Sequence, residues 1–455
     1  MFYRTVGDPL EPRGVGDPLE TDMDSMPPSP RYAWFLLVFL TLLNVFNFVD
    51  RQLIPSLAVL IMADLGLDNK QIGLLTGLVF ALFYTSVGIY LGTRADKGNR
   101  PFLIASGLVL WSALTAATGL AANFWQMAAA RVFVGVGEAT LTPTSIAMLS
   151  DVFPPRRRAL AAGVYYMGIP LGAGLSLVIS GLMGPDLGWR NCFFILGALG
   201  VVMVVPVLML KDPRRGQFEP TAAVADPPPR PRGAGAMFRE VAHHLIRIPS
   251  LGMTILGGSM VNVAVGANSF DATWLVKERG FTLKQAGLFL GLFFCLGGVV
   301  GNLVGGLLGD LFHKRWRNGR LLFLIGAQLV LTPLAISFRL VPADPIYLAL
   351  PCVFNAMLVT FYYGSVFATV QDLVPIHIRS TMLAVLVFSL NVFGVAPGAF
   401  MAGALADHFQ AAGYYQPLTR ALFIVGLMNL LALPLFYATS RRYVIDVARV
   451  KHEGA

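Results

Sequence analysis

Four charged residues stand inside long apolar stretches of the N-terminal half of this 455-residue sequence, and Asp271 stands inside one of the C-terminal half. Asp50 and Arg51 lie in the first such stretch, and Arg131 and Glu138 lie in the fourth. An ionised side chain costs about 2.5–3.5 kcal/mol in the middle of a membrane helix, so it persists only beside a partner or a water-filled space. These four residues are therefore the first candidates for binding or moving an ion or a substrate.

Glu138 has the surroundings that a proton-coupling group needs. Arg131 is seven residues away, so on a helix both side chains share one face, about 10 Å apart along the axis. Gly135 and Gly137 allow another helix to approach closely and bury the carboxyl group. Burial favours the neutral form of that group, whereas a nearby guanidinium favours the ionised form. We interpret Glu138, with Asp50, as a proton-coupling site; a permanent ion pair that holds helices together is the alternative.

Arg51 is a candidate for contact with the substrate. Asp50 and Arg51 are adjacent and therefore point in directions about 100° apart on a helix. The guanidinium group matches phosphate and carboxylate geometry. Our hypothesis is that Arg51, with Arg131, receives an anionic headgroup while Asp50 points to a neighbouring helix; alternatively, Arg51 is a counter-ion for Asp50 or Glu138. Further substrate-binding candidates, for which packing between helices is the competing interpretation, are Asn47, Phe46, Tyr165, Asn268, Tyr363 and Asn391.

The composition predicts an all-α membrane protein. Hydrophobic residues make up 56% of the chain and charged residues 13%, more apolar surface than a soluble core needs. A membrane helix needs about 20 mostly apolar residues. Twelve stretches qualify: 33–60, 71–91, 101–121, 125–150, 159–184, 191–210, 251–276, 284–309, 320–340, 347–371, 380–405 and 420–438.

These stretches divide the chain into two groups of six. We expect a disordered segment at 1–31, six-helix bundles at 32–210 and 251–440, a Pro-rich linker at 211–250 and a tail at 441–455. The net charge is +9, and most Lys and Arg residues fall in gaps on the side of the termini. This bias predicts cytoplasmic termini and argues against nucleic-acid binding. We expect the membrane to be a bacterial inner membrane.

The two groups repeat each other. Asp151-Val152-Phe153-Pro154 follows the fourth stretch, and Asp372-Leu373-Val374-Pro375 follows the tenth, 221 residues later. Matched signatures at matched positions indicate duplicated six-helix halves. Charged residues at these stretch ends are candidates for gating, with simple solvation of loops as the alternative. They are Asp96, Lys97, Arg100, Asp310, Asp151, Arg158, Asp372 and Arg379.

Several of these motifs resemble the major facilitator superfamily. The matching residues are Gly92, Asp96, Lys97 and Arg100 after the second stretch, Arg131, Gly135 and Gly137 in the fourth, Gly168-Ile169-Pro170-Leu171-Gly172 in the fifth, and Gly188-Trp189-Arg190 before the sixth. The resemblance implies twelve helices in two pseudo-symmetric bundles that transport by alternating access. It also implies that Asp96 and Asp310 cap a facing helix N-terminus and thereby latch the outward-facing state.

Finer features are similar to the Spinster family within that superfamily. Asn47-Phe48-Val49-Asp50-Arg51, the run Arg131–Ala139 and Asn99 carry this similarity. It implies that Arg51 takes part in substrate binding and Glu138 in proton linkage. It also implies an amphipathic anionic substrate, such as a lysolipid or a sphingoid phosphate.

The sequence therefore predicts a proton-linked rocker-switch transporter of an amphipathic anion. The alternatives are a facilitator for a small organic anion or a drug, and a non-transporting membrane sensor. We expect membrane lipids, substrate and protons as partners of a monomer. We expect no enzyme activity, metal or cofactor, since the chain lacks a phosphate-binding loop of the Gly-x-x-x-x-Gly-Lys-(Ser/Thr) type and its three cysteines have unrelated spacings.

Overall fold

The computed structural model of the protein describes residues 30–84, 87, 98–215, 218, 234–375 and 378–453. Within these residues the chain is helical and has no β-strand. Asp96 and Lys97, two predicted gating residues, lie outside them, as do residues 1–29, most of the segment predicted to be disordered.

Ten helical stretches of the described chain are long and apolar enough to cross a membrane. One of them, Arg156–Leu208, has 53 residues and reverses at Gly188, whose φ of 76° suits glycine. It corresponds to two predicted spans, so the ten stretches account for eleven of the twelve. The remaining predicted span, 71–91, is only partly described.

The N-terminal half precedes the linker. Its helices are α1 (Pro30–Arg51), α2 (Leu53–Ser56), α3 (Ala58–Leu65), α4 (Asn69–Thr76), α6 (Arg100–Thr118), α7 (Phe124–Glu138), α8 (Leu141–Val152), α9 (Pro155–Tyr166) and α10 (Gly168–Leu208). The linker contains α11 (Ala234–Arg247).

The C-terminal half follows in the same way. It consists of α12 (Pro249–Ala267), η2 (Asn268–Phe270), α13 (Asp271–Arg279), α14 (Leu283–Arg315), α15 (Gly319–Ser337), α16 (Pro345–Thr360), α17 (Tyr363–Asp372), α18 (Arg379–Leu390), η4 (Asn391–Val395), α19 (Ala396–Ala411), α20 (Pro417–Met428), η5 (Asn429–Leu431) and α21 (Ala432–Glu453). Residues 441–453 of the segment predicted as a tail therefore continue the last helix.

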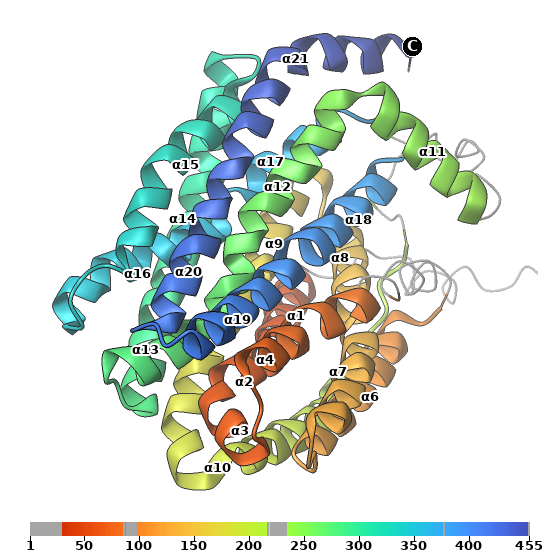
Figure 1. Ribbon diagram of the computed structural model, residues 1–455. Coiled ribbons are helices and arrows are strands. Elements are labelled where there is room, and N and C mark those ends of the chain that lie inside the picture. The colour runs from red at the N-terminus through yellow and green to blue at the C-terminus, as the bar shows by residue number, and fades with distance from the viewer. Residues whose placement is uncertain are drawn as a thin grey trace, which may run out of the picture.

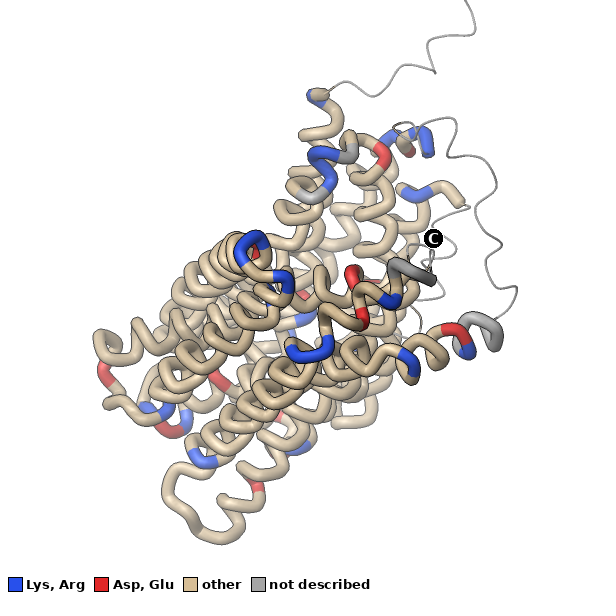
Figure 2. Tube along the Cα trace, turned by 90° about the horizontal axis from the view of Figure 1, so that it is seen from above, with Lys and Arg blue, Asp and Glu red and all other residues tan. Residues whose placement is uncertain are grey.

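The bundle has two ends, which we name by the chain segments they hold. Figure 1 shows α11 and the end of α21 at one end, the termini end, and α3, α13 and the bend of α10 at the other, the far end. Most charged positions lie near helix ends (Figure 2). Large apolar side chains cover the outside; Val202 and Val205 of α10, for example, are each more than 60% exposed. Such a surface requires lipid around it.

The two halves pack together mainly toward the far end. α10 lies against α14 and α4 lies against α19, and glycines bring their backbones close. A Cβ atom on Gly181 would lie 3.0 Å from the Cα atom of Gly287, and one on Gly73 would overlap the backbone of Ala399. The segments nearest the termini end, α8, α9, α17 and α18, make their extensive contacts within their own half. Among described residues, the halves are therefore joined at one end.

The first predicted span, 33–60, is interrupted rather than continuous. α1 ends at Arg51, and α2 and α3 follow after breaks at Gln52 and Leu57. Pro55 lies in α2 and has no N–H to donate to the carbonyl of Arg51, four residues earlier. This break leaves the Arg51 carbonyl available at the centre of the molecule.

Candidate functional site

A buried ion pair joins α1 and α7 at the centre of the N-terminal half. Arg51 donates from Nε and Nη2 to the same oxygen of Glu138, Oε2, at 3.0 and 2.9 Å. The other oxygen of Glu138, Oε1, accepts no hydrogen bond from a described residue. The Glu138 side chain is fully buried, whereas the Arg51 side chain is 16% exposed. Arg51 is thus the member of the pair whose side chain is accessible from outside the protein interior.

Arg131 supports this pair from α7. Its Nη2 donates to the Arg51 carbonyl, which Pro55 leaves free, at 2.5 Å. Arg131 is buried, and its Nε has no acceptor among the described residues. The two arginines and Glu138 therefore form one cluster, which we call the Arg51–Glu138 cluster.

Aromatic rings surround the two guanidinium groups. The Cζ atom of Arg51 lies 4.6 Å from the ring centres of Phe48 and Phe80 and 4.3 Å from that of Tyr84. The Cζ atom of Arg131 lies 4.7 Å from the Phe80 ring centre. Ring faces attract cations, most strongly where water is scarce. These rings form an aromatic cage around Arg51, whose Nε and Nη2 donate to Glu138.

The hydrogen bond that the structure gives to the Asp50 side chain comes from outside the Arg51–Glu138 cluster. Asp50 points to α6, where the hydroxyl of Thr115 donates to its Oδ2 at 2.6 Å. The direction differs from that of Arg51, as expected for adjacent positions on a helix. α6 also approaches α7 closely, since a Cβ atom on Gly137 would lie 2.9 Å from the Gly107 carbonyl oxygen. This approach buries Glu138, as the glycine spacing predicts.

Tyr363 is the next of the remaining substrate-binding candidates. It belongs to α17 in the other half, is partly exposed, and is close enough to Arg51 for an electrostatic interaction. Its ring lies 4.4 Å from that of Tyr362, whose hydroxyl accepts a hydrogen bond from Asn262 at 2.6 Å. Tyr363, Tyr362 and Asn262 thus form a series of polar contacts within the C-terminal half.

Three candidates lie inside the N-terminal half instead. Tyr165 is fully buried, with its hydroxyl 3.3 Å from Thr142. Phe46 packs against α10 beside Gly200. Asn47 is 1% exposed, and its Nδ2 has no acceptor among the described residues. In this conformation these three positions contribute to helix packing.

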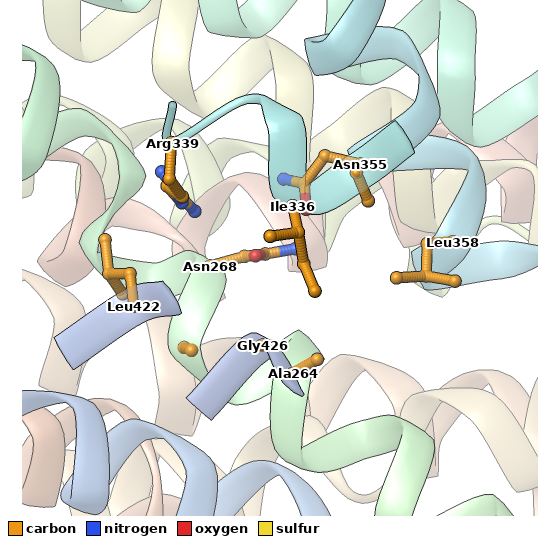
Figure 3. A pocket seen from close by; sticks show the side chains of 10 residues that line it. Ala264, Asn268, Ile336, Arg339, Asn355, Leu358, Leu422 and Gly426 are labelled. Carbon is orange, nitrogen blue, oxygen red and sulfur yellow. The ribbon is translucent and has the colours of Figure 1, made fainter. Parts of the chain in front are cut away.

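The last two candidates lie in the C-terminal half, apart from Arg51. Asn391 begins the π-helical segment η4 and donates to the Val387 carbonyl at 2.8 Å. Asn268 lines a pocket between α12, α15, α16 and α20 (Figure 3). Single-sequence reasoning could not rank these asparagines, because it does not reveal which helix face meets which neighbour.

The gating candidates form two similar clusters at the termini end. In the first, Arg100 pairs with Asp151 at 2.5 Å and with Asp212 at 2.6 Å. In the second, Arg320 pairs with Asp372 at 2.8 Å and with Asp310 at 3.1 Å.

Both clusters join the start of the third helix of a half to the end of the fourth, as the internal repeat predicts. Arg158 and Arg379 also correspond, each donating to a nearby backbone carbonyl. Asp310 here binds Arg320, and the capping of a facing helix remains a prediction for another conformation.

A carboxylate at the far end connects the two halves. Asp407 of α19 accepts from the backbone N–H and the side chain of Asn69 at 3.2 and 2.7 Å, and from the N–H of Lys70 at 2.7 Å. These N–H groups open α4, where a negative charge is stabilised by the unpaired donors and the helix dipole. We call this contact the Asp407 latch. The sequence analysis missed it because nothing local to Asp407 indicates a partner more than 330 residues away.

A second buried ion pair lies in the C-terminal half. Arg339 donates from Nη2 to Asp271 Oδ1, and Asn355 donates to Asp271 Oδ2 at 3.1 Å. Asp271 stands 221 residues after Asp50, the same offset that separates Asp151 from Asp372. The two aspartates thus occupy repeated positions with different partners. The sequence analysis singled out Asp271 but overlooked Arg339, which lies at the edge of its span.

This arrangement of paired bundles agrees with comparisons to known proteins. The sequence profile of the Major Facilitator Superfamily matches residues 35–394. The chain belongs to the major facilitator superfamily.

Among its relatives is an "MFS-type efflux pump" of Mycolicibacterium smegmatis, 32% identical over 420 residues, or 92% of this chain and 95% of that protein. A "Probable sphingolipid transporter spinster homolog 1" of Arabidopsis thaliana is 31% identical over 197 residues, 39% of this chain and 40% of that protein.

The superfamily fold also appears in solved structures. A bacterial homolog of the human lysosomal transporter Spinster, crystallised in an inward-facing and unoccupied conformation, matches with a TM-score of 0.78 and 25% identity. The match covers 92% of this chain and 99% of that structure. The predicted fold and the resemblance to the Spinster family are therefore confirmed.

Proposed function

We propose that this facilitator transports an amphipathic anion together with a proton. The observation that carries the proposal is the Arg51–Glu138 pair, in which a sealed carboxylate and a partly exposed guanidinium share hydrogen bonds. An anionic headgroup at Arg51 competes with Glu138 for the same donors. When the anion binds, Glu138 loses its counter-ion, and a buried carboxylate without a counter-ion favours protonation. Anion and proton are then bound together.

The amphipathic character of the substrate is supported by the surroundings of Arg51. Phe48, Phe80 and Tyr84 form apolar surface around the cation, and Tyr363 adds a hydroxyl group from the other half. A headgroup on Arg51 with an acyl chain along such rings fits this arrangement. The name of the Arabidopsis relative, a probable sphingolipid transporter, supports the same substrate class.

Alternating access follows from the contacts between the halves. We propose that the termini end faces the cytoplasm of a bacterial cell and that the described state is open to that side. The Asp407 latch and the glycine contacts of α4 with α19 close the far end. The clusters around Arg100 and Arg320 would join across the halves in the opposite state, in which Asp96 and Asp310 cap facing helices.

A second function is supported by the efflux-pump relative, which aligns with nearly the whole chain. A cationic drug would bind the Glu138 carboxylate in place of a proton, so drug and proton would exchange rather than travel together. The direction of proton movement therefore separates the two functions. A small organic anion would use Arg51 without needing the aromatic cage.

The test is an uptake screen in proteoliposomes under an imposed pH gradient. The substrates are a lysophospholipid, a sphingoid phosphate, a small dicarboxylate and a cationic drug. We expect the amphipathic anions to accumulate on the alkaline side, driven by the proton gradient. Exclusive exchange of the cationic drug for protons would overturn the proposal. Transport of the dicarboxylate alone would show that the substrate is a small anion and not an amphipathic lipid.

A further inference from the structure

A basic surface lies at the termini end of the C-terminal half, where the junction of α14 and α15 meets α21. Asn318 of the junction donates to the hydroxyl and the carbonyl of Ser440 at 2.8 and 3.3 Å, and α15 lies beside α21 (Figure 1). This contact holds two groups of exposed basic side chains in neighbouring positions. They are Lys314, Arg315 and Arg317 on the junction, and Arg441 and Arg442 on α21. We call these five residues the α14–α21 basic surface.

The charge of this surface is not balanced within the described part of the chain. None of the five cations forms an ion pair with a described residue. The acids of the same segments have other partners: Asp310 pairs with Arg320 at 3.1 Å, and Asp446 is 4% exposed and accepts from the N–H of Ser250 at 3.3 Å. Such a concentration of positive charge attracts an anionic partner.

Two aromatic side chains place this surface at the level of lipid headgroups. Trp316 stands between Arg315 and Arg317 and is 48% exposed. Tyr437 is 52% exposed, and its hydroxyl accepts from Nε and Nη2 of Arg441 at 3.0 and 2.6 Å. Exposed Trp and Tyr residues are typical of the membrane–water interface, where one part of the ring system is apolar and another is polar.

An apolar face continues from the basic surface along the outside of the bundle. The exposed positions 427, 431, 434, 437 and 441 are three or four residues apart and therefore follow one face from α20 to α21. On the neighbouring α15, Leu322, Leu329 and Val330 are also exposed. These faces suit acyl chains, so the chemistry of the region is that of a lipid with an anionic headgroup.

We propose that the α14–α21 basic surface binds an anionic phospholipid with two phosphate groups, of the cardiolipin type. One phosphate lies against Arg315 and Arg317, the other lies against Arg441 and Arg442, and the acyl chains follow α15 and α21. Guanidinium groups suit this role because their forked donors match phosphate oxygens. The surface is separate from the Arg51–Glu138 cluster, and its test measures lipid binding, so its outcome is independent of the proposed transport function.

The experiment is native mass spectrometry of the full chain in detergent, titrated with one lipid at a time. The lipids are cardiolipin with two phosphates, phosphatidylglycerol with one, and zwitterionic phosphatidylethanolamine. At equal phosphate concentration we expect cardiolipin to bind about tenfold more tightly than phosphatidylglycerol, and phosphatidylethanolamine to bind most weakly. Equal affinities for cardiolipin and phosphatidylglycerol would overturn the proposal.

A pair of double variants locates the binding. Arg441→Gln with Arg442→Gln removes two charges from the surface, so the affinity for cardiolipin should fall about tenfold. Arg156→Gln with Arg157→Gln is the matched control, because these adjacent arginines are also exposed and begin α9 at the same end of the other half. Affinity in the control should stay within about twofold of wild type. Unchanged affinity in the first variant, or equal losses in both, would overturn the proposal.

The two-phosphate arrangement has its own check in Arg315→Gln with Arg317→Gln. Removing either pair of arginines leaves the contact for one phosphate, so each of these variants should bind cardiolipin no more tightly than phosphatidylglycerol. The replaced residues are exposed, so the fold should be retained, which gel filtration verifies. An undiminished preference for cardiolipin in either variant would contradict the arrangement.

Discussion

The two halves of this transporter each bury an arginine–carboxylate pair, and the pairs differ in how many hydrogen bonds their carboxylates accept. In the C-terminal half, both oxygens of Asp271 accept hydrogen bonds, and both partners are nearly sealed. In the N-terminal half, Glu138 uses one oxygen, and Arg51 remains partly exposed. The Asp271 carboxylate is therefore fully used in structural hydrogen bonds, whereas Glu138 and Arg51 can exchange partners.

The largest expected difference between the pairs is in proton coupling. Glu138→Gln keeps the size of the side chain but removes the group that takes up the proton, so accumulation driven by a pH gradient should fall to the level seen without a gradient. The matched variant Asp271→Asn should retain gradient-driven accumulation. Uptake of labelled substrate into proteoliposomes measures both, and loss of coupling in Asp271→Asn alone would reverse our assignment.

The second expected difference is in stability. Asp271→Ala leaves Arg339 buried without a counter-ion, which should lower the free energy of unfolding by about 3–5 kcal/mol. Glu138→Ala should cost less, because Arg51 can turn toward the space beside it. Thermal unfolding of the purified variants ranks the two, and a larger loss in Glu138→Ala would contradict the comparison.

Arg51 should discriminate between ligand charges. Replacing it with Ala removes charge-assisted hydrogen bonds, so affinity for an anionic lysolipid should fall about tenfold to a hundredfold. A zwitterionic analogue should lose much less. Binding measured by calorimetry in detergent provides both values, and equal losses for the two ligands would reject the headgroup hypothesis.

The smallest expected effect concerns the Asp407 latch. Asp407→Ala removes a charge from the N-terminus of α4 and should shift the balance between conformations by about 0.5–2 kcal/mol toward opening of the far end. Asp68→Ala is the control, because Asp68 caps the same helix from within its own half. Spin-label distances across the far end report the shift, which should be absent in the control.

Most of the fold was predictable because apolar stretches of membrane length and the repeated Asp-x-x-Pro signature are local features. The break after Arg51 was missed, although Pro55 was a visible signal for it. Partners that lie far apart in the sequence could not be paired in the same way. The Asp407 latch and the Asp271–Arg339 pair depend on the rotation of each helix, which one sequence does not contain.

The charged residues of the candidate site were predictable from the sequence, but their hydrogen-bond and ring partners were not. Burial of an ionised group is costly wherever it occurs, so Arg51, Arg131 and Glu138 were identifiable from residue type and position. The pairing of Glu138 with Arg51 was one open alternative among several. The cage of Phe48, Phe80 and Tyr84 gave no signal, because aromatic residues are common in membrane helices.

The central claim is that substrate and proton meet at the Arg51–Glu138 pair, and substrate-driven proton movement tests it most directly. Proteoliposomes enclosing a pH-sensitive dye receive an anionic amphiphile on the outside, with no gradient imposed. Our account predicts that the interior becomes more acidic as substrate enters and that Glu138→Gln abolishes this change. Alkalinisation in the wild type, or the same acidification in Glu138→Gln, would contradict the account.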